Sequence, residues 1–468
     1  MSLFGTIYLG KSGVNTMSRG LDVSADNVAN LESTGFRASR ALFEDLMLSA
    51  TNEAPPEDQR GLGTAVKTIE VLYHEGPIKV TDNPTDLAIT GKGFFTVSDG
   101  EDVFYTRDGG FILREVEDAL RLSTPSGYDL YGWAVPQSTD GETVTSGSLA
   151  PVEIPQYISG QPTSNIILQL NCDSSRPPET TNLTLLEKWD GTQEEPISSG
   201  GYELKVDLPV WDNIGQQHQL SLYLDRTDQA RTFEFLVAMD PSEDWRGEGK
   251  YAGCLLTGLL HFGSLGVLES IDNLQLITSP TGDTTSLNPE DLPDGLPAFT
   301  VNFTGTPQQI TLDFGLYFDA DAGEWQRVES RASTAFAAPF SAVYQYLNGY
   351  PPGTFEEINV TEKGVVQAKY TNNQTFDIAR IPLALFGSPD DLERAGANLF
   401  KAVSGAEPDY FAPDRNAVGT IIGGALEDSN VDLAQEMVRL ITLQRAFQSN
   451  TRVITTADQM LDDFIRSI

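Results

Sequence analysis

Side chains that could perform catalysis or hold a metal ion are few in this 468-residue sequence and lie far apart. The three histidines are His74, His218 and His261, and the two cysteines are Cys172 and Cys254. Their spacing matches neither the H-E-x-x-H pattern of a metalloprotease helix nor the closely spaced pairs of a zinc site. We therefore expect no catalytic residue and no metal site. The sequence does not decide whether the two cysteines form a disulfide with each other.

Two short motifs are similar to known binding loops but lack parts that those loops need. Residues 91–93, Gly-Lys-Gly, are not followed by the Lys-Thr spacing and the helix of a phosphate-binding loop. Residues 319–323, Asp-Ala-Asp-Ala-Gly, place glycine one position earlier than a calcium loop does, and no glutamate occupies the twelfth position. We interpret the second motif as a hairpin turn and expect no cofactor. With no nucleophile elbow either, the sequence predicts a protein that is not an enzyme.

Composition and charge exclude further classes of protein. The chain has 67 acidic and 30 basic residues, and its net charge of −37 opposes binding to nucleic acid, whose phosphates carry the same sign. An apolar fraction of 40% is typical of a folded chain. No run of 18 apolar residues predicts a membrane span, and the N-terminus lacks the pattern of a secretory signal. The segments 1–48 and 427–468 sum to only −4, which favours ends that pack together and a middle that faces solvent.

The last 40 residues show the strongest periodic pattern in the chain. Neither proline nor glycine interrupts 429–468, and large apolar residues recur there at intervals of seven: Leu433, Leu440, Phe447, Ile454, Leu461 and Ile468. A repeat of this length predicts a long helix that packs along another helix, with Met437 beside the main line. Ser429 or Asn430 can cap its start, and Asp432 places a favourable negative charge in the first turn.

Residues 3–31 show a second, weaker heptad pattern. Its apolar members are Leu3, Ile7, Val14, Met17, Leu21, Val28 and Leu31, with Gly10 and Ser24 in the same line. Four glycines, each about 1 kcal/mol less favourable than alanine in a helix, make this segment marginal on its own. We expect it to pair with the C-terminal helix. Two unrelated surface helices would be the commoner arrangement, and the matching periods at both ends favour pairing.

The residues between the two helical segments predict strands and turns. Alternating apolar residues and glycine-rich turns indicate all-β structure from residue 76 to 410. The clearest strands are expected at 204–210, 219–224, 232–238, 298–303 and 309–312. Before them, we expect a short helical run at 41–48 and a strand at 66–73.

Several of these stretches resemble motifs of the bacterial flagellar rod and hook proteins. In the first half they are Ala29-Asn30 with Thr34-Gly35-Phe36, then 86–89, 91–95 and 106–111. In the second half they are 348–353, 378–386 and, as the most specific, 424–433 with 444–450. The resemblance covers nearly the whole chain, although the middle matches only in scattered turns. Rod proteins of the family lack the long middle and its return at 348–353, which favours the hook branch.

The resemblance and the order of segments imply a multidomain α plus all-β fold. The N- and C-terminal helices are expected to form a coiled-coil-like pair that carries nested β-rich inner and outer domains. The expected domains are a terminal helical domain at 1–31 and 427–468, a connecting arm at 32–75 and 411–426, an inner β domain at 76–150 and 335–410, and an outer β domain at 151–334.

The resemblance also implies a function. Hook subunits self-assemble into a curved hollow helical tube that acts as a flexible universal joint between the motor rod and the filament, outside the cell and exported without a cleaved signal peptide. The implied partners are copies of the chain itself, the distal rod protein, the hook-filament junction protein, the hook cap and the flagellar export apparatus. A distal rod subunit of the basal body and an extracellular β-rich adhesin or binding protein stay open as alternatives.

Assembly is expected to depend on the two heptad lines and on the residues that place the arm. These are Leu3, Ile7, Val14, Met17, Leu21, Val28, Asn30, Leu31, Gly35, Phe36, Ser429, Asn430, Val431, Leu433, Met437, Leu440, Phe447, Ile454 and Leu461. Each apolar member could equally pack within its own subunit.

Overall fold

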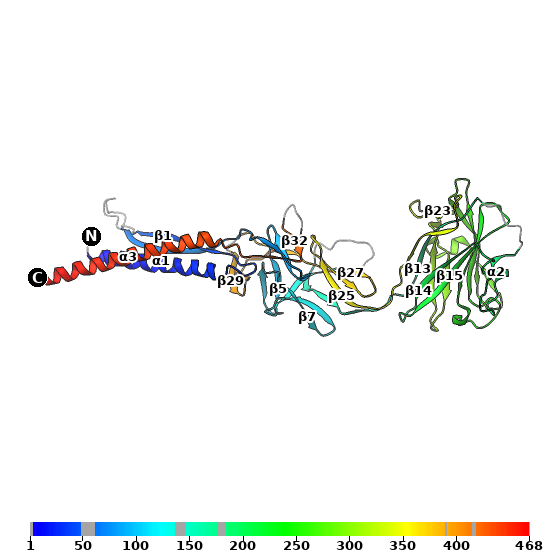
Figure 1. Ribbon diagram of the computed structural model, residues 1–468, viewed down its shortest axis with the longest axis horizontal. Helices are drawn as coiled ribbons and strands as arrows, with labels where there is room; N and C mark the ends of the chain where they lie inside the picture. The colour runs from blue at the N-terminus through cyan, green and yellow to red at the C-terminus, as the bar shows by residue number, and fades with distance from the viewer. Residues whose placement is uncertain are drawn as a thin grey trace. The chain divides into compact units, whose positions relative to one another are not determined.

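A computed structural model describes residues 3–47, 61–135, 147–175, 183–388, 391–413 and 418–467 of the chain (Figure 1). The chain divides into two compact units: unit 1 contains residues 1–156 and 355–468, and unit 2 contains residues 157–354. Nearly all regular structure is β-sheet, with one long helix near each end of the chain. The prediction of a mostly β protein with terminal helices is therefore confirmed.

Unit 1 has helices at its two ends and short strands between them. Its elements before unit 2 are α1 (Leu3–Ala29), β1 (Ser39–Met47), β2 (Gly61–Val71), β3 (Ile78–Val80), β4 (Leu87–Thr90), β5 (Phe95–Ser98), β6 (Val103–Thr106), β7 (Ile112–Val116), β8 (Ala119–Ser123), β9 (Asp129–Ala134), β10 (Leu149–Pro151) and β11 (Glu153–Pro155). After unit 2 they are β25 (Gly353–Val360), β26 (Val365–Tyr370), β27 (Thr375–Arg380), β28 (Leu383–Leu385), β29 (Leu392–Gly396), β30 (Leu399–Ala402), β31 (Asp409–Phe411), β32 (Thr420–Gly423), β33 (Ala425–Glu427) and α3 (Leu433–Ser467).

The start of α3 differs from the expectation. The carboxylate of Asp432 accepts hydrogen bonds from the backbone amides of Ala434 and Gln435 at 2.9 and 3.2 Å. This is the geometry of a helix cap, because the first amides of a helix have no partner within the helix. Asp432 therefore caps α3, and neither Ser429 nor Asn430 does.

Strands β1 and β2 correct the prediction of a helical run at 41–48. They pair antiparallel from Ser39 with Val71 to Met47 with Gly61, and they pack beside α1. The hydroxyl of Ser12 on α1 donates to the carbonyl of Thr64 at 2.6 Å. The apolar residues of this segment were read as one face of a helix, but their long-range partner in β2 makes them a strand. Tertiary pairing here overrides a short local pattern.

The main sheet of unit 1 is built from both halves of its sequence. Its strand order is β25-β26-β27-β9-β5-β6-β30-β29, with β10 added to β9 and β8 joining β7 and β11. Two pairings join the halves: Arg380 of β27 lies opposite Trp133 of β9, and Phe400 of β30 lies opposite Tyr105 of β6. The sheet is therefore complete only when residues on both sides of unit 2 are present.

Unit 2 is almost entirely β. Its elements are β12 (Tyr157–Ile158), β13 (Asn165–Asn171), α2 (Leu185–Lys188), β14 (Leu204–Trp211), β15 (Gln217–Arg226), β16 (Thr232–Met239), η2 (Pro241–Glu243), β17 (Cys254–Phe262), β18 (Leu268–Ile277), β19 (Thr284–Ser286), η3 (Pro289–Asp291), η4 (Pro293–Gly295), β20 (Ala298–Val301), β21 (Gln308–Asp313), β22 (Leu316–Asp319), β23 (Glu324–Arg327) and β24 (Ser341–Leu347). The five clearest strands expected from the sequence are confirmed within two residues at their ends. The hairpin turn expected at 319–323 joins β22 to β23.

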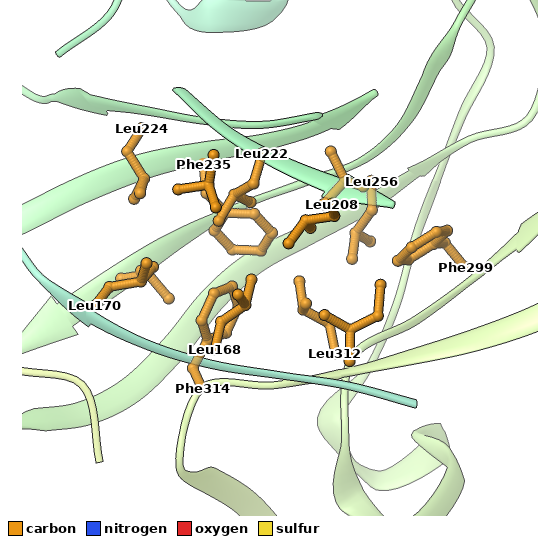
Figure 2. Close-up of a cluster of buried hydrophobic side chains, with 14 of the residues drawn as sticks. Leu168, Leu170, Leu208, Leu222, Leu224, Phe235, Leu256, Phe299, Leu312 and Phe314 are labelled. Carbon is orange, nitrogen blue, oxygen red and sulfur yellow. The ribbon is translucent and has the colours of Figure 1, made fainter. Parts of the chain in front are cut away.

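Two sheets of unit 2 enclose a large apolar core. The first is an antiparallel meander in the order β14-β15-β16-β17-β18-β19, and the second has the order β20-β21-β13-β24. Figure 2 shows side chains from both sheets pointing toward one another, among them Leu222 and Phe235 from the meander and Leu168 and Leu312 from the second sheet. Alternation along β13 and β14 directs every second side chain inward, which is how two facing sheets form a common core.

Strand β16 is buried along its whole length because both of its faces are covered. Phe233, Phe235 and Val237 point into the main core, whereas Leu236 and Ala238 belong to a second cluster with Leu185 of α2, Trp189 and Ile197. Burial of every residue along a strand is typical of a sheet with two covered faces. Cys172 and Cys254 are buried in these two clusters and are both free, so the disulfide left open by the sequence is not formed.

Residues 335–354 lie in unit 2, whereas the sequence placed them at the start of the returning inner domain. Strand β24 pairs antiparallel with β13, from Ile166 with Leu347 to Asn171 with Ser341. This pairing closes the second sheet of unit 2, so the chain leaves this unit about 20 residues later than its motifs indicated.

Candidate assembly surface

Helices α1 and α3 pack antiparallel along a line of small residues. A Cβ added at Gly10 would come within 2.7 Å of Cγ1 of Ile454, and one at Gly13 would come within 2.6 Å of the Asn450 side chain. A Cβ at Gly20 would meet Phe43 at 3.0 Å and Leu443 at 3.2 Å. Glycine lets the backbones approach closely, which offsets its low helix propensity.

The deeply buried positions of α1 are therefore not the apolar positions of its heptad pattern. The buried residues are Gly10, Gly13, Thr16, Gly20, Ser24 and Asn27, whereas Ile7, Val14, Met17, Leu21 and Val28 are only half-buried. Among the members of the heptad line whose burial the structure describes, only Gly10 and Ser24 are fully buried. A search for small residues at this spacing could have predicted where α1 approaches α3 most closely.

On α3 the residues that face inward recur at alternating intervals of four and three. They are Glu436, Leu440, Leu443, Phe447, Asn450, Ile454, Ala457 and Leu461, all buried or half-buried. Four members of the seven-residue line found in the sequence lie on this side. Leu433 and Met437 do not, because they are 42% and 44% exposed.

Other apolar side chains of α3 are uncovered in the single chain. Met437, Val438, Ile441, Val453, Met460 and Ile465 are between 40% and 66% exposed. Tyr8 of α1 is also exposed. Soluble monomers rarely expose so many large apolar residues on one element, and such a surface is typical of a protein interface.

A groove lies beside these exposed residues, so the apolar surface is concave at this point. It encloses about 680 Å³ between α1, β1 and the first half of α3, and its walls include Val23, Ala41, Phe43, Val438 and Leu443. Ridges of one helix pack into grooves of another, so this concave and mostly apolar strip is suited to a further helix.

Asn430 joins the segments that follow α1 and precede α3. Its side-chain oxygen accepts from the backbone amide of Ala38 at 2.7 Å, and its amide nitrogen donates to the carbonyls of Leu72 and His74, both at 2.8 Å. The side chain thus satisfies backbone groups on both sides of the β1–β2 pair. It therefore connects the residues that flank the β1–β2 pair to the segment that leads into α3.

Glu427 forms a buried ionic centre next to this contact. Its carboxylate lies 2.7 Å from Nη2 of Arg37 and 3.2 Å from Nη1 of Arg107, and it accepts from the amide of Gly76 at 2.8 Å. All three charged side chains are buried. Burial lowers the pKa of Arg107 to about 10, while the charge of Glu427 opposes that shift. Removal of one partner from such a site would leave a buried charge without compensation.

Gly35 and Phe36 shape the same junction. Gly35 has φ of +68°, and a Cβ there would come within 2.5 Å of the amide nitrogen of Asp108, so only glycine fits. Phe36 is buried with Ala38 and Val431, and the guanidinium of Arg394 lies 4.9 Å from the centre of its ring.

The structure thus gathers the predicted arm residues into one junction. Asn30 lies just after α1 and donates to the carbonyl of Asp26, Leu31 packs against the Phe36 cluster, and the hydroxyl of Ser429 accepts from the amide of Val431. Leu3 is the first residue of α1. Sequence reasoning missed Glu427, Arg37 and Arg107 as functional candidates, because their ionic contact joins residues that are more than 300 positions apart.

No arrangement in the described residues supports metal chemistry, since none of them form a group of three or more His, Cys, Asp and Glu side chains suited to an ion. Burial raises the pKa of Glu234 to about 7, but its carboxylate accepts from the amide of Leu185 and holds α2 in place. Among the helices that the structure describes, none is long and apolar enough to cross a membrane.

Comparison with known proteins assigns the class. Three family models match the sequence: the FlgE/F/G D1 domain of flagellar hook proteins at residues 88–168, the D2 domain of the flagellar basal body protein FlaE at 180–350, and the C-terminal segment of the basal body rod proteins FlgEFG at 422–467. These models describe structural proteins of the flagellar axis and not enzymes.

Individual relatives match over nearly their full length. The flagellar hook protein FlgE of Treponema pallidum is 28% identical over 487 residues, covering 98% of this chain and 98% of the relative. That of Salmonella typhimurium is 27% identical over 460 residues, covering 97% and 98%. The crystal structure of Helicobacter pylori flagellar hook protein FlgE2 overlaps with 75% of this chain and all of that chain, with 13% identity and a TM-score of 0.46. The chain belongs to the flagellar rod and hook protein family.

Proposed function

We propose that this chain is a structural subunit of the bacterial flagellar hook that polymerises through its terminal helices. The relatives that match 97–98% of the chain are hook proteins, which supports this assignment. The observation that carries the mechanism is the uncovered apolar surface of α3 and the groove beside it. A helix with large apolar residues on more than one side needs more than one neighbour.

The proposed subunit has a coiled-coil-like domain formed by its terminal helices, and nested inner and outer β domains formed by the residues between them. The antiparallel packing of α1 on α3 and the insertion of unit 2 between the two parts of unit 1 support this organisation. In the proposal, residues 1–31 and 427–468 form the helical domain, 32–75 and 411–426 the arm, and the remaining β residues the inner and outer domains.

In the proposed polymer, each α3 contacts α1 of its own subunit on one side and helices of neighbouring subunits on the other. Contacts between different surfaces of identical subunits generate a helical filament when they do not close into a ring. The polymer is a curved hollow tube outside the cell that serves as the universal joint between rod and filament. Its further partners are the distal rod protein, the junction protein, the cap and the export apparatus.

A distal rod subunit is the less favoured assignment. The match of the FlaE D2 domain across residues 180–350 and full-length similarity to hook proteins both favour the hook. No described feature specifically supports an adhesin or binding module.

The proposal is tested by Val438→Asp and Ile441→Asp in the full-length chain. Both residues are at least half exposed, so each variant should fold, with stability within about 0.5 kcal/mol of the parent chain. Each places a charge in the proposed interface, where burying it without a partner costs several kcal/mol. We expect sedimentation and electron microscopy to show loss of polymer while circular dichroism is unchanged.

Ile112→Asp provides a matched control, because Ile112 on β7 is 47% exposed and lies outside the helices. This variant should polymerise normally. Filaments of normal length from both α3 variants would show that the exposed side of α3 is not the assembly surface. A straight, stiff rod from the parent chain would favour the distal rod assignment.

A further inference from the structure

Unit 2 contains a long segment without charge in an otherwise acidic surface. Residues 157–354 include 27 acidic and nine basic side chains, a net charge of −18, yet no Asp, Glu, Lys or Arg occurs from Ala332 to Phe355. Charged residues make up 21% of the whole chain, so a gap of this length is a local departure from its composition. The segment includes β24 and the loop that leads into it.

The loop is held in a defined conformation by Asn171 at the end of β13. The Asn171 side-chain oxygen accepts from the amide of Phe336 at 3.1 Å and from the hydroxyl of Thr334 at 3.0 Å. Its amide nitrogen donates to the carbonyls of Ala338 and Pro339. These four contacts fix the approach to β24, so the surface is organised before any partner arrives.

Large apolar side chains lie uncovered on this organised segment. Phe336 is 53% exposed, and Val343, Tyr344 and Tyr346 on β24 are 60%, 50% and 48% exposed. Leu265, in the turn that contacts residues 335 and 336, is 83% exposed. We call these five residues the β24 patch. Aromatic side chains without nearby charges are typical of the centres of protein interfaces.

Strand β24 is also an edge strand of its sheet. Natural edge strands are usually protected from pairing with other chains by charged residues or proline. From Ser341 to Leu347 the sequence is SAVYQYL, which contains neither. A strand of this kind left uncovered would promote aggregation, so its composition indicates that something covers it.

We propose that the β24 patch is a contact site for a second copy of this chain, in addition to the contact made by the terminal helices. This inference rests on the proposed function, which brings many copies together. Two copies that each carry a charge of −37 repel one another, so a contact between them is favoured where charge is absent. A strongly basic partner would instead select an acidic surface, which unit 2 offers elsewhere.

The first test measures whether the patch becomes covered on assembly. Both native cysteines are buried, so a cysteine introduced on the surface would be the thiol that reacts with a maleimide. Ala337→Cys places that thiol next to Phe336 of the patch, and Ala322→Cys places it in the exposed turn between β22 and β23. We expect labelling at residue 337 to be at least roughly ten-fold slower in the polymer than in the monomer, the equivalent of about 1.4 kcal/mol of protection. Labelling at residue 322 should be equally fast in both.

The second test measures the contribution of the contact to assembly. Tyr344→Glu and Tyr346→Glu should raise the critical concentration for polymerisation roughly ten-fold or more, because truncating or charging an aromatic residue at an interface centre typically costs over 1 kcal/mol. Tyr344→Phe keeps the ring and should assemble like the parent. Tyr317→Glu on β22 changes an exposed tyrosine outside the patch and should leave the critical concentration unchanged.

The outcomes separate this inference from the proposed function. Polymers in which residue 337 reacts as fast as in the monomer would overturn the β24 contact and leave the hook assignment intact. A parent chain that stays monomeric would overturn both. Protection of residue 337 in isolated flagella but not in the purified polymer would show that a different flagellar protein covers the patch, which also contradicts the proposal.

Discussion

The β-sandwich of unit 2 and the helix pair of unit 1 differ in how completely they bury their apolar side chains. All eight residues of β16 are buried, and the two faces of this strand supply two separate cores. Helix α3 is 35 residues long and has only three fully buried positions among those described, while seven of its large apolar side chains are at least 40% exposed. The core of the sandwich therefore encloses its apolar strands within one chain, whereas much of the apolar surface of α3 is uncovered in the single chain.

The largest expected effect tests the sandwich side of this contrast. Phe235→Ala removes a wholly buried ring from the main core of unit 2 and should lower its free energy of unfolding by about 3–5 kcal/mol. Four of the five tryptophans lie in unit 2, so tryptophan fluorescence during urea unfolding reports mainly on this unit.

Val438→Ala on α3 is the matching change on the helix side. Because Val438 is 66% exposed in the single chain, the monomer should lose no more than about 0.5 kcal/mol. Similar losses in both variants would contradict the contrast, since α3 would then be as self-contained as β16.

A smaller effect of about 3 kcal/mol is expected from the one acidic residue buried in β16. Burial raises the pKa of Glu234 from its ordinary value of 4.5 to about 7, with Asp225 and Glu187 adding to the shift and Lys188 and the amide of Leu185 opposing it. A raised pKa means that the folded state holds this proton more tightly than the unfolded state. Its stabilising contribution is full below about pH 4.5 and is lost as the pH rises to about 7.

Glu234→Gln should remove this pH dependence while keeping an oxygen that accepts from Leu185. The variant should therefore gain stability relative to the parent as the pH rises from about 4.5 to 7, followed by tryptophan fluorescence in urea at several pH values. An unchanged difference between variant and parent across this range would show that folding does not raise the pKa of Glu234.

A smaller effect than that of Glu234 is expected at the contact between the two helices. Gly10→Ala should improve helix propensity by about 1 kcal/mol, yet the new Cβ would lie 2.7 Å from Ile454 and 3.3 Å from the carbonyl of Asn450. Overpacking costs about 1–3 kcal/mol, so we expect net destabilisation of the helix pair. Thermal melting followed by far-ultraviolet circular dichroism measures it.

Ala25→Gly on the exposed side of α1 calibrates propensity alone and should cost about 1 kcal/mol. If Gly10→Ala instead raised the melting temperature, the helices would have room to separate, and close approach would not be the reason for the glycines.

The sequence was most informative where one local period extends over many residues. The seven-residue line of Leu440, Phe447, Ile454 and Leu461 located α3 and four of its inward positions. The alternation of β14 and the apolar run of β16 located the sandwich strands within two residues. In each case the side chains repeat with the geometry of their own element, so no distant residue is needed to recognise the pattern.

Contacts between distant segments were not predictable in the same way. The run at 41–48 was predicted to be helical from its local pattern alone. Its pairing partner, β2, begins at residue 61, and nothing in the run itself indicates that partner. The close contact of α1 depends on Gly13 and Gly20, which a search for apolar residues passes over. Glu427 has no distinctive local sequence, and only the fold brings Arg37 and Arg107 to its carboxylate.

The junction around Glu427 and Asn430 has a consequence for the order in which the chain folds. Synthesis delivers α1 first, but the glycines that pack on α3 meet that partner only when α3 follows more than 400 residues later. Contacts between residues so far apart in the sequence form slowly. The isolated α1 segment is only marginally stable as a helix, because its four glycines disfavour helix formation. Unit 2, whose contacts lie within one continuous segment, can fold in the interval. We therefore expect α1 to complete its packing only when the last helix is available.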